Sequence, residues 1–457
     1  MHTRVSRREF LRSSAALSIA GAAAPFALNL AAMGTAAAQS ADYRALVCLF
    51  LHGGNDHTNM VVPFDIGSHA EYSNARSSIA LTREELASTA LGPVAQQGGR
   101  EFALHPSLSA ISRLYHEGKA AVVANVGPLI VPTTKAQYQA RSVPLPPKLF
   151  SHNDQQAAWQ AFVASGEGVR HGWGGTLGDQ FASMNSTAAF TCISAAGNAV
   201  WLSGRNMVQY QVSTSGALTM NAITGSLYGS SAATTAYRTL VTQASSNLFE
   251  HEMGVVNRRS IETNEMLRAA LPPSTFFTTP LPASNSLASQ LNVVARMIAG
   301  RAALGLNRQV FMVSLGGFDH HDDLITQQAS RLSTVNSAVD AFWSWLGELG
   351  MQPNVTLFTA SDFGRTLTSN GDGSDHGWGA HHLVVGGGLA GGTIHGDFPP
   401  TAYGTAYDVG QGNLLPGIAV DQFAATFGRW LGVGDSSMPT VLPNIGNFAS
   451  RYLPLYA

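Results

Sequence analysis

Charged residues are scarce in this chain, and lysine is the scarcest of them. Asp, Glu, Lys and Arg make up 12% of the 457 residues, and the formal net charge is −2. An ordinary soluble protein has about 25% charged residues. The lysines are Lys119, Lys135 and Lys148. Such a weak, slightly negative charge offers no attraction for nucleic acid or for an anionic membrane surface, so we expect neither as a partner.

Cysteine is almost absent as well. Cys48 and Cys192 stand in no metal-ligand spacing with each other, and Cys48 lies inside the apolar run 45–51. That position is typical of a small buried core residue, so we do not expect thiolate catalysis. In an oxidising compartment the two thiols could still form a disulfide, and the sequence leaves this open.

The N-terminus has the pattern of an export signal. A twin-arginine motif occupies Ser6–Leu11, and an alanine-rich apolar stretch then leads to a small-residue cleavage signal at Ala36–Ala38. Pro25 and Asn29 interrupt the apolar stretch, which argues against a stable membrane anchor. We expect residues 1–38 to be a signal peptide read by the twin-arginine translocase, and the mature protein to be periplasmic or secreted.

Strand-like and helix-like segments alternate along the rest of the chain. Continuous apolar runs, typical of strands buried on both faces, occupy residues 45–51, 120–126, 309–315, 355–359 and 382–385. Apolar residues at helical spacing occupy residues 108–115, 287–298, 325–349 and 420–431. This rhythm predicts an α/β fold with a doubly wound, mostly parallel sheet and helices on both faces.

The stretch from about residue 195 to 286 has a different composition. It is dense in Ser, Thr, Asn and Gly, and prolines interrupt it at 272–273 and 280–282. Helical periodicity is present only in parts of it, such as 240–268. We therefore expect a single domain over residues 42–457, with residues 195–286 as a polar, cap-like insertion.

Carboxylates follow two of the predicted strands. Asp319 comes after the run 309–315, and Asp362 comes after 355–359. Ligands and metals bind at the carboxyl ends of the strands of such sheets. Asp319 and His321 are two residues apart, so in an extended segment both side chains point to the same side. We expect all three to be metal ligands, although Asp362 could instead cap a following helix.

Two further residues extend this candidate metal site. His376 lies beside Gly377, which lets the backbone approach a ligand closely, and it precedes the run 382–385. Asp56 follows the first strand and is another candidate ligand, the alternative being an Asx turn that closes the loop. Carboxylates together with imidazoles suit zinc or manganese better than magnesium or calcium.

The sequence also offers candidate catalytic groups. Ser151 and His152 precede the apolar stretch 157–163 and mark a helix N-terminus, where a hydroxyl can cap the helix or react. Ser151 is a candidate nucleophile, activated by a metal or by His152. Arg365 could bind an anionic oxygen of the substrate, or it could pair with Asp362.

Taken together, these motifs resemble the exported bacterial family catalogued as domain of unknown function 1501, within the alkaline phosphatase and sulfatase superfamily. The matching elements are His52–Asp56, Leu104–Pro106, Ser151–His152, Gly316–Asp319, Ser361–Arg365, Asp375–Gly377 and Gly386–Gly388. The resemblance covers essentially the whole mature chain. It implies an alkaline phosphatase-like fold and a metal bound by Asp319, His321, Asp362, His376 and, more loosely, Asp56.

This chain departs from the superfamily at Phe363. The superfamily commonly has Asp-His-Gly where this chain has Asp-Phe-Gly, which leaves a second metal one ligand short. The resemblance therefore implies one divalent cation, or at most two. Ser151 matches the nucleophile position only by its order in the chain, and Thr133 or Thr134 could serve instead.

Two functions are compatible with these patterns. One is an exported metal-dependent hydrolase that acts on phosphate or sulfate esters, either small molecules or polymers. The other is a non-catalytic periplasmic protein, binding or structural, that keeps the superfamily fold and one metal.

Overall fold

The computed structural model describes residues 43–161 and 171–456. Residues 44–456 belong to one compact unit. The predicted signal peptide, residues 1–38, lies outside the described residues. Within the described ranges, no helix combines the length and the apolar character needed to cross a bilayer.

A nine-stranded sheet forms the centre of the fold, in the order β13-β5-β12-β9-β1-β8-β6-β7, with β14 also paired to β5. The strands are β1 (Arg44–Leu51), β5 (Ala120–Gly127), β6 (Cys192–Ser194), β7 (Tyr210–Gln211), β8 (Arg308–Leu315), β9 (Val355–Ser361), β12 (Ala380–Gly386), β13 (Ile394–His395) and β14 (Ile418–Ala419). Only β12 runs antiparallel to its neighbours β5 and β9. The sheet is therefore mostly parallel, as the apolar runs predicted.

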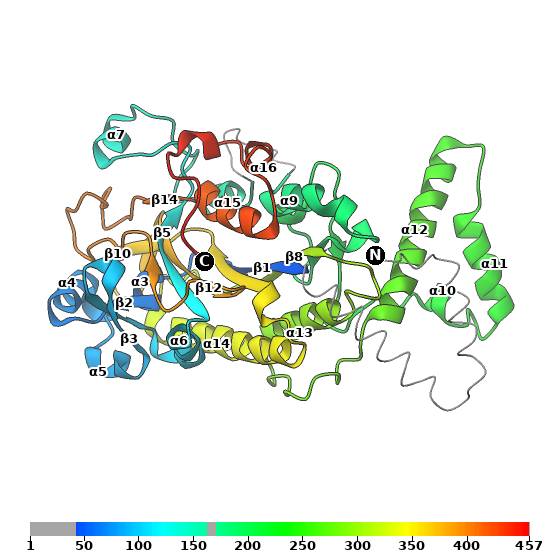
Figure 1. The fold of residues 1–457 in the computed structure, drawn as a ribbon, viewed down its shortest axis with the longest axis horizontal. Coiled ribbons are helices and arrows are strands. Elements are labelled where there is room, and N and C mark those ends of the chain that lie inside the picture. The colour runs from blue at the N-terminus through cyan, green and yellow to red at the C-terminus, as the bar shows by residue number, and fades with distance from the viewer. Residues whose placement is uncertain (1–42, 162–170, 457) are drawn as a thin grey trace, which may run out of the picture. The chain divides into compact units, whose positions relative to one another are not determined.

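Helices cover both faces of this sheet (Figure 1). On one face lie α9 (Trp173–Phe181) and α15 (Val420–Leu431), and on the other lie α6 (Ser109–His116), α13 (Ser286–Ala299) and α14 (Leu324–Glu348). The doubly wound α/β prediction is confirmed. Gly432 ends α15 with a φ of 108°, a left-handed conformation that glycine adopts without steric cost.

Smaller elements surround the central layers. Two small sheets are formed by β2 (Val61–Pro63), β3 (Ala90–Val94) and β4 (Arg100–Leu104), and by β10 (Arg365–Ser369) and β11 (Ser374–His376). The remaining helices are α3 (His57–Met60), α4 (Ile66–Arg76), α5 (Arg83–Leu86), α7 (Lys135–Ala140), α8 (His152–Ala161), α10 (Asn221–Thr224), α11 (Ser231–Thr242), α12 (Leu248–Ala270) and α16 (Met438–Val441).

The segment predicted as an insertion consists mainly of helices. It contains α10, α11 and α12, and α11 packs along α12 at one end of the view (Figure 1). Its first part still contributes β7 to the central sheet through a parallel pairing with β6. A cap-like role for this segment stays a prediction.

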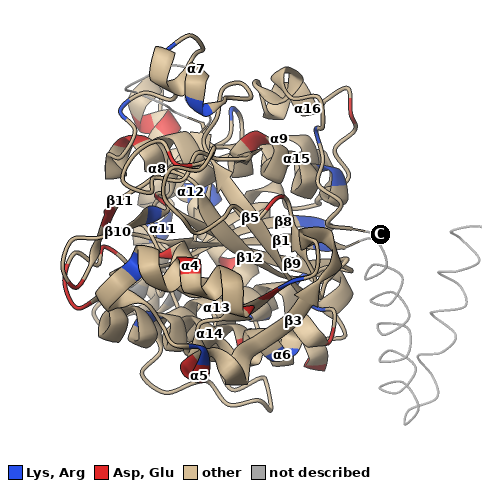
Figure 2. Cartoon of the chain, turned by 90° about the vertical axis from the view of Figure 1, so that its left-hand side faces the viewer, with Lys and Arg blue, Asp and Glu red and all other residues tan. Residues whose placement is uncertain are grey.

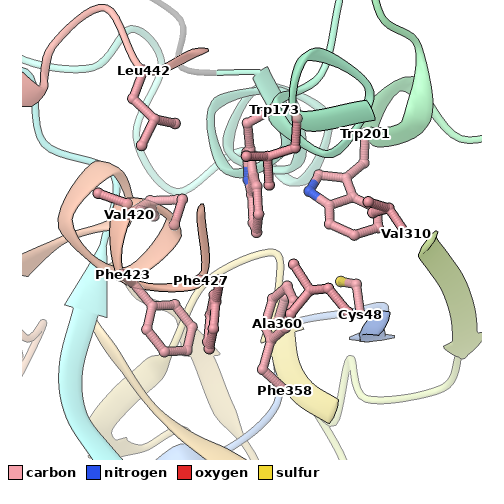
Figure 3. Packing of buried hydrophobic residues seen from close by; sticks show 14 of the residues in the cluster. Cys48, Trp173, Trp201, Val310, Phe358, Ala360, Val420, Phe423, Phe427 and Leu442 are labelled. Carbon is pink, nitrogen blue, oxygen red and sulfur yellow. The ribbon is translucent and has the colours of Figure 1, made fainter. Parts of the chain in front are cut away.

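The main core lies between the sheet and helices α9 and α15 (Figure 3). Side chains alternate across a strand, so Cys48 of β1 and Phe358 and Ala360 of β9 all face this layer. Phe358 stacks on Phe427 of α15, with ring centroids 4.6 Å apart. Close aromatic packing of this kind holds α15 against the sheet.

Both cysteines lie in this core as free thiols. Cys48 and Cys192 are buried and unbridged, which answers the disulfide question that the sequence left open. Burial raises the pKa of both thiols, so neither forms a thiolate at neutral pH.

Charged side chains are sparse on the surface (Figure 2), but one ion pair is completely buried. Nη2 of Arg76, at the end of α4, lies 2.5 Å from Oδ2 of Asp56, and neither side chain is exposed to solvent. Nη1 of Arg76 also donates to the carbonyl of Thr366 at 2.8 Å. Burial acts to raise the pKa of Asp56, but the charges of Arg76 and His57 outweigh it and leave that pKa below its ordinary value.

We expect Arg76→Met to lower the free energy of unfolding by about 3–5 kcal/mol, because it leaves the Asp56 carboxylate buried without its counter-charge. Chemical denaturation measures this change. Arg113→Met is the matched control, because Arg113 makes its ion pairs at the surface, where such a pair contributes less than about 1 kcal/mol. Equal losses in the two variants would contradict the assignment.

A second buried carboxylate predicts a pH dependence of stability. Burial raises the pKa of Asp421, at the start of α15, to about 7. The folded state therefore holds a proton that the unfolded chain releases near pH 4, and stability falls as pH rises from about 4 to about 7, by up to about 4 kcal/mol. Asp421→Asn should remove this decline. If the free energy of unfolding declines equally with pH in the parent protein and in Asp421→Asn, this prediction is wrong.

Candidate metal centre

Four side chains from three distant segments meet beyond the carboxyl ends of β8 and β9. His152 is the first residue of α8, Asp319 and His321 lie in the loop after β8, and His376 ends β11. The ligand atoms of His152, Asp319 and His376 all lie within 4.8 Å of one another. The predicted proximity of Asp319 and His321 is also present, with His321 Nε2 3.0 Å from Asp319 Oδ1.

The distances between these ligand atoms can be compared with those around a bound zinc ion. Nε2 of His376 is 3.1 Å from Nε2 of His152 and 3.1 Å from Nε2 of His321. The carboxylate oxygens of Asp319 are 3.4 Å from Nε2 of both His152 and His376. Ligands at about 2.0–2.1 Å from a tetrahedral zinc ion lie about 3.3 Å from one another. The separations among His152, Asp319 and His376 are therefore those of ligands that could share one ion, and His321 lies at the edge of this group, close to Asp319 and His376.

Hydrogen bonds at the other ring nitrogen anchor His152 and His376, and His321 lies beside a carboxylate. Nδ1 of His152 is 2.7 Å from Oδ2 of Asp362, and Nδ1 of His376 is 2.9 Å from the carbonyl oxygen of Phe150. Nδ1 of His321 is 3.3 Å from Oδ1 of Asp375. Metal-binding histidines usually donate their second ring N–H to a carboxylate or a backbone carbonyl in this way.

These anchors determine the chemistry of the cluster. A carbonyl or an ionised carboxylate only accepts hydrogen bonds, so the anchored Nδ1 atoms carry the protons. With Nδ1 protonated, His152 and His376 turn Nε2 toward each other and toward the Asp319 carboxylate, and Nε2 of His321 lies beside them. Lone pairs at about 3 Å repel unless a cation lies among them, so the donor set fits a bound metal ion.

The charges around the cluster also favour a divalent cation. Asp319, Asp362 and Asp375 contribute three negative charges, while Arg365 contributes one positive charge. Burial lowers the pKa of His376, which favours its neutral form, so this ring does not offset the surplus. A divalent ion would balance the surplus.

Asp362, expected as a direct ligand, lies behind His152. Its side chain is buried, and Oδ2 accepts hydrogen bonds from the backbone N–H of Gly53 at 3.1 Å and from Nε2 of Gln156 at 2.8 Å, in addition to His152. Through Oδ2 it holds His152, while its Oδ1 is buried without a hydrogen-bond partner. The alternative of a helix cap is wrong, because the next element is strand β10 rather than a helix.

The side chain of Arg365 is surrounded by protein groups and does not face solvent. Its side chain is fully buried, and Nη1 donates to Oδ1 of Asp319 at 2.7 Å and to the carbonyl of Gly53 at 3.2 Å. Its remaining nitrogens donate to Ser374. Burial acts to raise the pKa of Asp319, but the hydrogen bond and charge of Arg365 keep it below its ordinary value. Arg365 thus pairs with Asp319 and not with Asp362.

Asp56, the most loosely expected ligand, lies outside the cluster. Its Oδ1 caps α3 by accepting the N–H of Asn59 at 3.0 Å, and its Oδ2 pairs with Arg76 and accepts from Ser374 Oγ at 3.0 Å. Asp56 therefore caps α3 and forms a buried ion pair, away from the cluster. Through Ser374 it supports Arg365 from behind.

Ser151 lies immediately before α8, half-buried, and its hydroxyl donates to Oδ2 of Asp154 at 2.6 Å. It is not bonded to His152, because both ring nitrogens of His152 face Asp362 and the cluster. The alternative nucleophiles make local contacts: Thr133 Oγ1 donates to the carbonyl of Val131, and Thr134 caps α7.

Sequence reasoning missed three parts of this centre. His152 was expected as a catalytic residue and stands among the ligands, while Asp375 and the carbonyl of Phe150 anchor two of the rings. A helix N-terminus gives no sign of which distant loop it will meet. The one available signal was the adjacency of Asp375 to His376.

We expect Asp362→Asn to weaken the binding of zinc by about 10–100-fold, because the amide no longer draws the Nδ1 proton of His152 as a carboxylate does. Competition with a metal chelator measures this affinity. Asp375→Asn is the matched control, since its contact with His321 is longer and exposed, and its loss should be smaller. Unchanged affinity in Asp362→Asn would overturn the anchoring role.

Comparisons with known proteins add the following. Similar solved structures include the PsFucS1 sulfatase from Pseudoalteromonas sp. (11% identity, 88% of this chain and 70% of that chain covered, TM-score 0.36) and the lipoteichoic acid synthase LtaP from Listeria monocytogenes (8% identity, 87% and 74% covered, TM-score 0.34). At such TM-scores these likenesses carry no functional argument. A search of the curated proteins found no match. The family described as "Protein of unknown function (DUF1501)" matches residues 43–438, and the chain belongs to this family.

Proposed function

We propose that this protein is an exported, periplasmic or secreted hydrolase of phosphate or sulfate esters that depends on a divalent metal. The observation that carries the proposal is the meeting of three imidazole Nε2 atoms, two of them on rings anchored at Nδ1, with the carboxylate of Asp319. Three imidazoles and one carboxylate suit zinc or manganese, whereas calcium and magnesium prefer sites made of oxygen alone.

The donor set supports a single ion. Phe363 stands where the superfamily commonly has a histidine, and its ring lies 4.7 Å from those of both His152 and His376. It is fully buried and offers no ligand atom. The side of the cluster that could hold a second cation is therefore covered by an apolar ring.

The cluster can be reached from solvent, as a reaction requires. The side chains of Asp319 and His321 are 45% and 40% exposed, whereas those of His152 and His376 are 28% and 27% exposed. A bound divalent cation would polarise an ester there and stabilise negative charge on its oxygens. Arg365 would keep Asp319 ionised and in place while the substrate binds.

Ser151 remains the candidate nucleophile. Its hydroxyl proton already points to Oδ2 of Asp154, so Asp154 would take that proton as the Ser151 oxygen attacks phosphorus or sulfur, while the bond to the ester oxygen breaks and the alcohol leaves after taking a proton from water. Nζ of Lys148 lies 3.6 Å from the Asp154 carboxylate. His152 is occupied by the cluster, so the base would be Asp154 and not His152.

The second candidate is a non-catalytic exported protein that binds one structural cation. The observation in its favour is the number of donors. His152, Asp319 and His376 form the cluster, and a shift of His321 toward them would supply the fourth ligand that closes a tetrahedral ion, as in structural zinc sites, whereas catalytic sites keep one position open. In this case the cation would join α8 to the loop after β8 and to the end of β11 and would stabilise the fold.

We expect purified protein, loaded with zinc or manganese, to hydrolyse 4-nitrophenyl phosphate or 4-nitrophenyl sulfate. Asp319→Asn should reduce turnover by at least about 100-fold, because it weakens both the cation site and its link to Arg365. Release of 4-nitrophenol measures the rate. Asp322→Asn, a change at an exposed residue of the same loop, is the control and should alter turnover less than about twofold.

A chelator separates the two candidates in the same experiment. Loss of turnover on chelation supports the hydrolase. Bound metal without turnover on either ester, together with a lower melting temperature after chelation, supports the structural cation. No turnover and no bound metal would reject both.

A further inference from the structure

We propose that a second site, separate from the metal centre, binds a small amphipathic anion with an apolar body and one acidic group. It is a cavity of about 550 Å³ between the loop that follows β5, the start of α7 and the loop before β14. Ligand sites for small molecules usually measure about 300–1,000 Å³. None of the side chains of the metal cluster lines it.

The walls of this cavity are apolar and firmly packed. Leu129, Leu415 and Phe448 line it, and each is at most 5% exposed. All three belong to one hydrophobic cluster with Trp378. A wall of this kind is preformed, so an apolar ligand can enter without reordering the chain.

Two polar groups in the lining are left with hydrogen-bonding capacity. Nζ of Lys135 donates to the carbonyl of Thr405 at 3.1 Å, and an ammonium has two more protons to donate. The hydroxyl of Tyr407 has no hydrogen-bond partner among the described residues. Burial and the nearby charge of Asp397 raise the pKa of Tyr407, so it stays protonated and can donate.

The charge of the lining selects the ligand class. Lys135 is the cationic side chain among the described residues of the lining, and no Asp or Glu belongs to that lining. Lys135 also forms no ion pair with a described carboxylate. A single ammonium beside a phenol hydroxyl in an apolar cavity matches one carboxylate, sulfonate or sulfate group on an aromatic or aliphatic body.

The cavity and the metal centre share one edge of the sheet. Strands β5 and β9 both run antiparallel to β12, so their carboxyl ends point the same way. Trp378, two residues after the cluster residue His376, separates the two sites. Its buried indole N–H donates to the carbonyl of Pro128 at 2.9 Å, next to Leu129 in the cavity wall.

The test uses 8-anilinonaphthalene-1-sulfonate, which has an aromatic body and one sulfonate, and whose fluorescence rises in apolar sites. We expect one saturable site on the full mature protein. Lys135→Met should weaken binding by about tenfold or more, the loss of one charge-assisted hydrogen bond. Tyr407→Phe should weaken it less, and Ala406→Trp should block it by filling the cavity from its exposed rim.

Lys119→Met is the matched control, because Lys119 is exposed and does not line the cavity. It should bind the dye as the parent protein does. Asp319→Asn should also bind it normally, so the result is independent of the proposed hydrolase activity. Melting temperatures close to that of the parent exclude dye binding by loosened variants.

Equal affinity in the parent protein, Lys135→Met and Tyr407→Phe would overturn the proposal, and so would dye binding that does not saturate. Both substitutions are at partly exposed side chains, so they test the site even if Ala406→Trp fails to fold.

Discussion

The site depends on one constraint: the rings of His152 and His376 are each held through Nδ1 against a hydrogen-bond acceptor in the protein. The carboxylate of Asp362 and the carbonyl of Phe150 are those acceptors. Because Nδ1 is held there, the Nε2 atoms of both rings point toward each other and toward Asp319. The geometry of the candidate metal centre therefore depends on the acceptors behind the rings.

This chain has few charged residues, and several of those that are buried lie behind the cluster. Asp319 is held by Arg365, Arg365 donates to Ser374, and the hydroxyl of Ser374 donates to Asp56. Asp56 in turn pairs with Arg76 inside the fold. Each buried polar group is supported by the next, which makes the position of Asp319 depend on packing far from the solvent-facing ligands.

The sheet order explains why these groups meet. Strands β8 and β9 flank β1 and run parallel to it, so the residues that follow both strands emerge at the same edge of the sheet, on either side of the residues that follow β1. Gly53, just after β1, has a φ of 115° and comes so close that a Cβ atom would lie 2.5 Å from the backbone nitrogen of Asp319. Glycine allows this approach, and its N–H and carbonyl bond Asp362 and Arg365.

The sequence by itself determined the α/β fold, the strand ends that carry Asp319 and Asp362, and the pairing of Asp319 with His321, because periodicity and short spacing are local properties. The tertiary structure decided what each group does. His152 is 210 residues from Asp362 and 224 from His376, yet it contacts both. Asp362 holds His152, Arg365 holds Asp319, and Asp56 pairs with Arg76. Contacts across such distances follow from how the strands and helices pack, and no local pattern of residues encodes them.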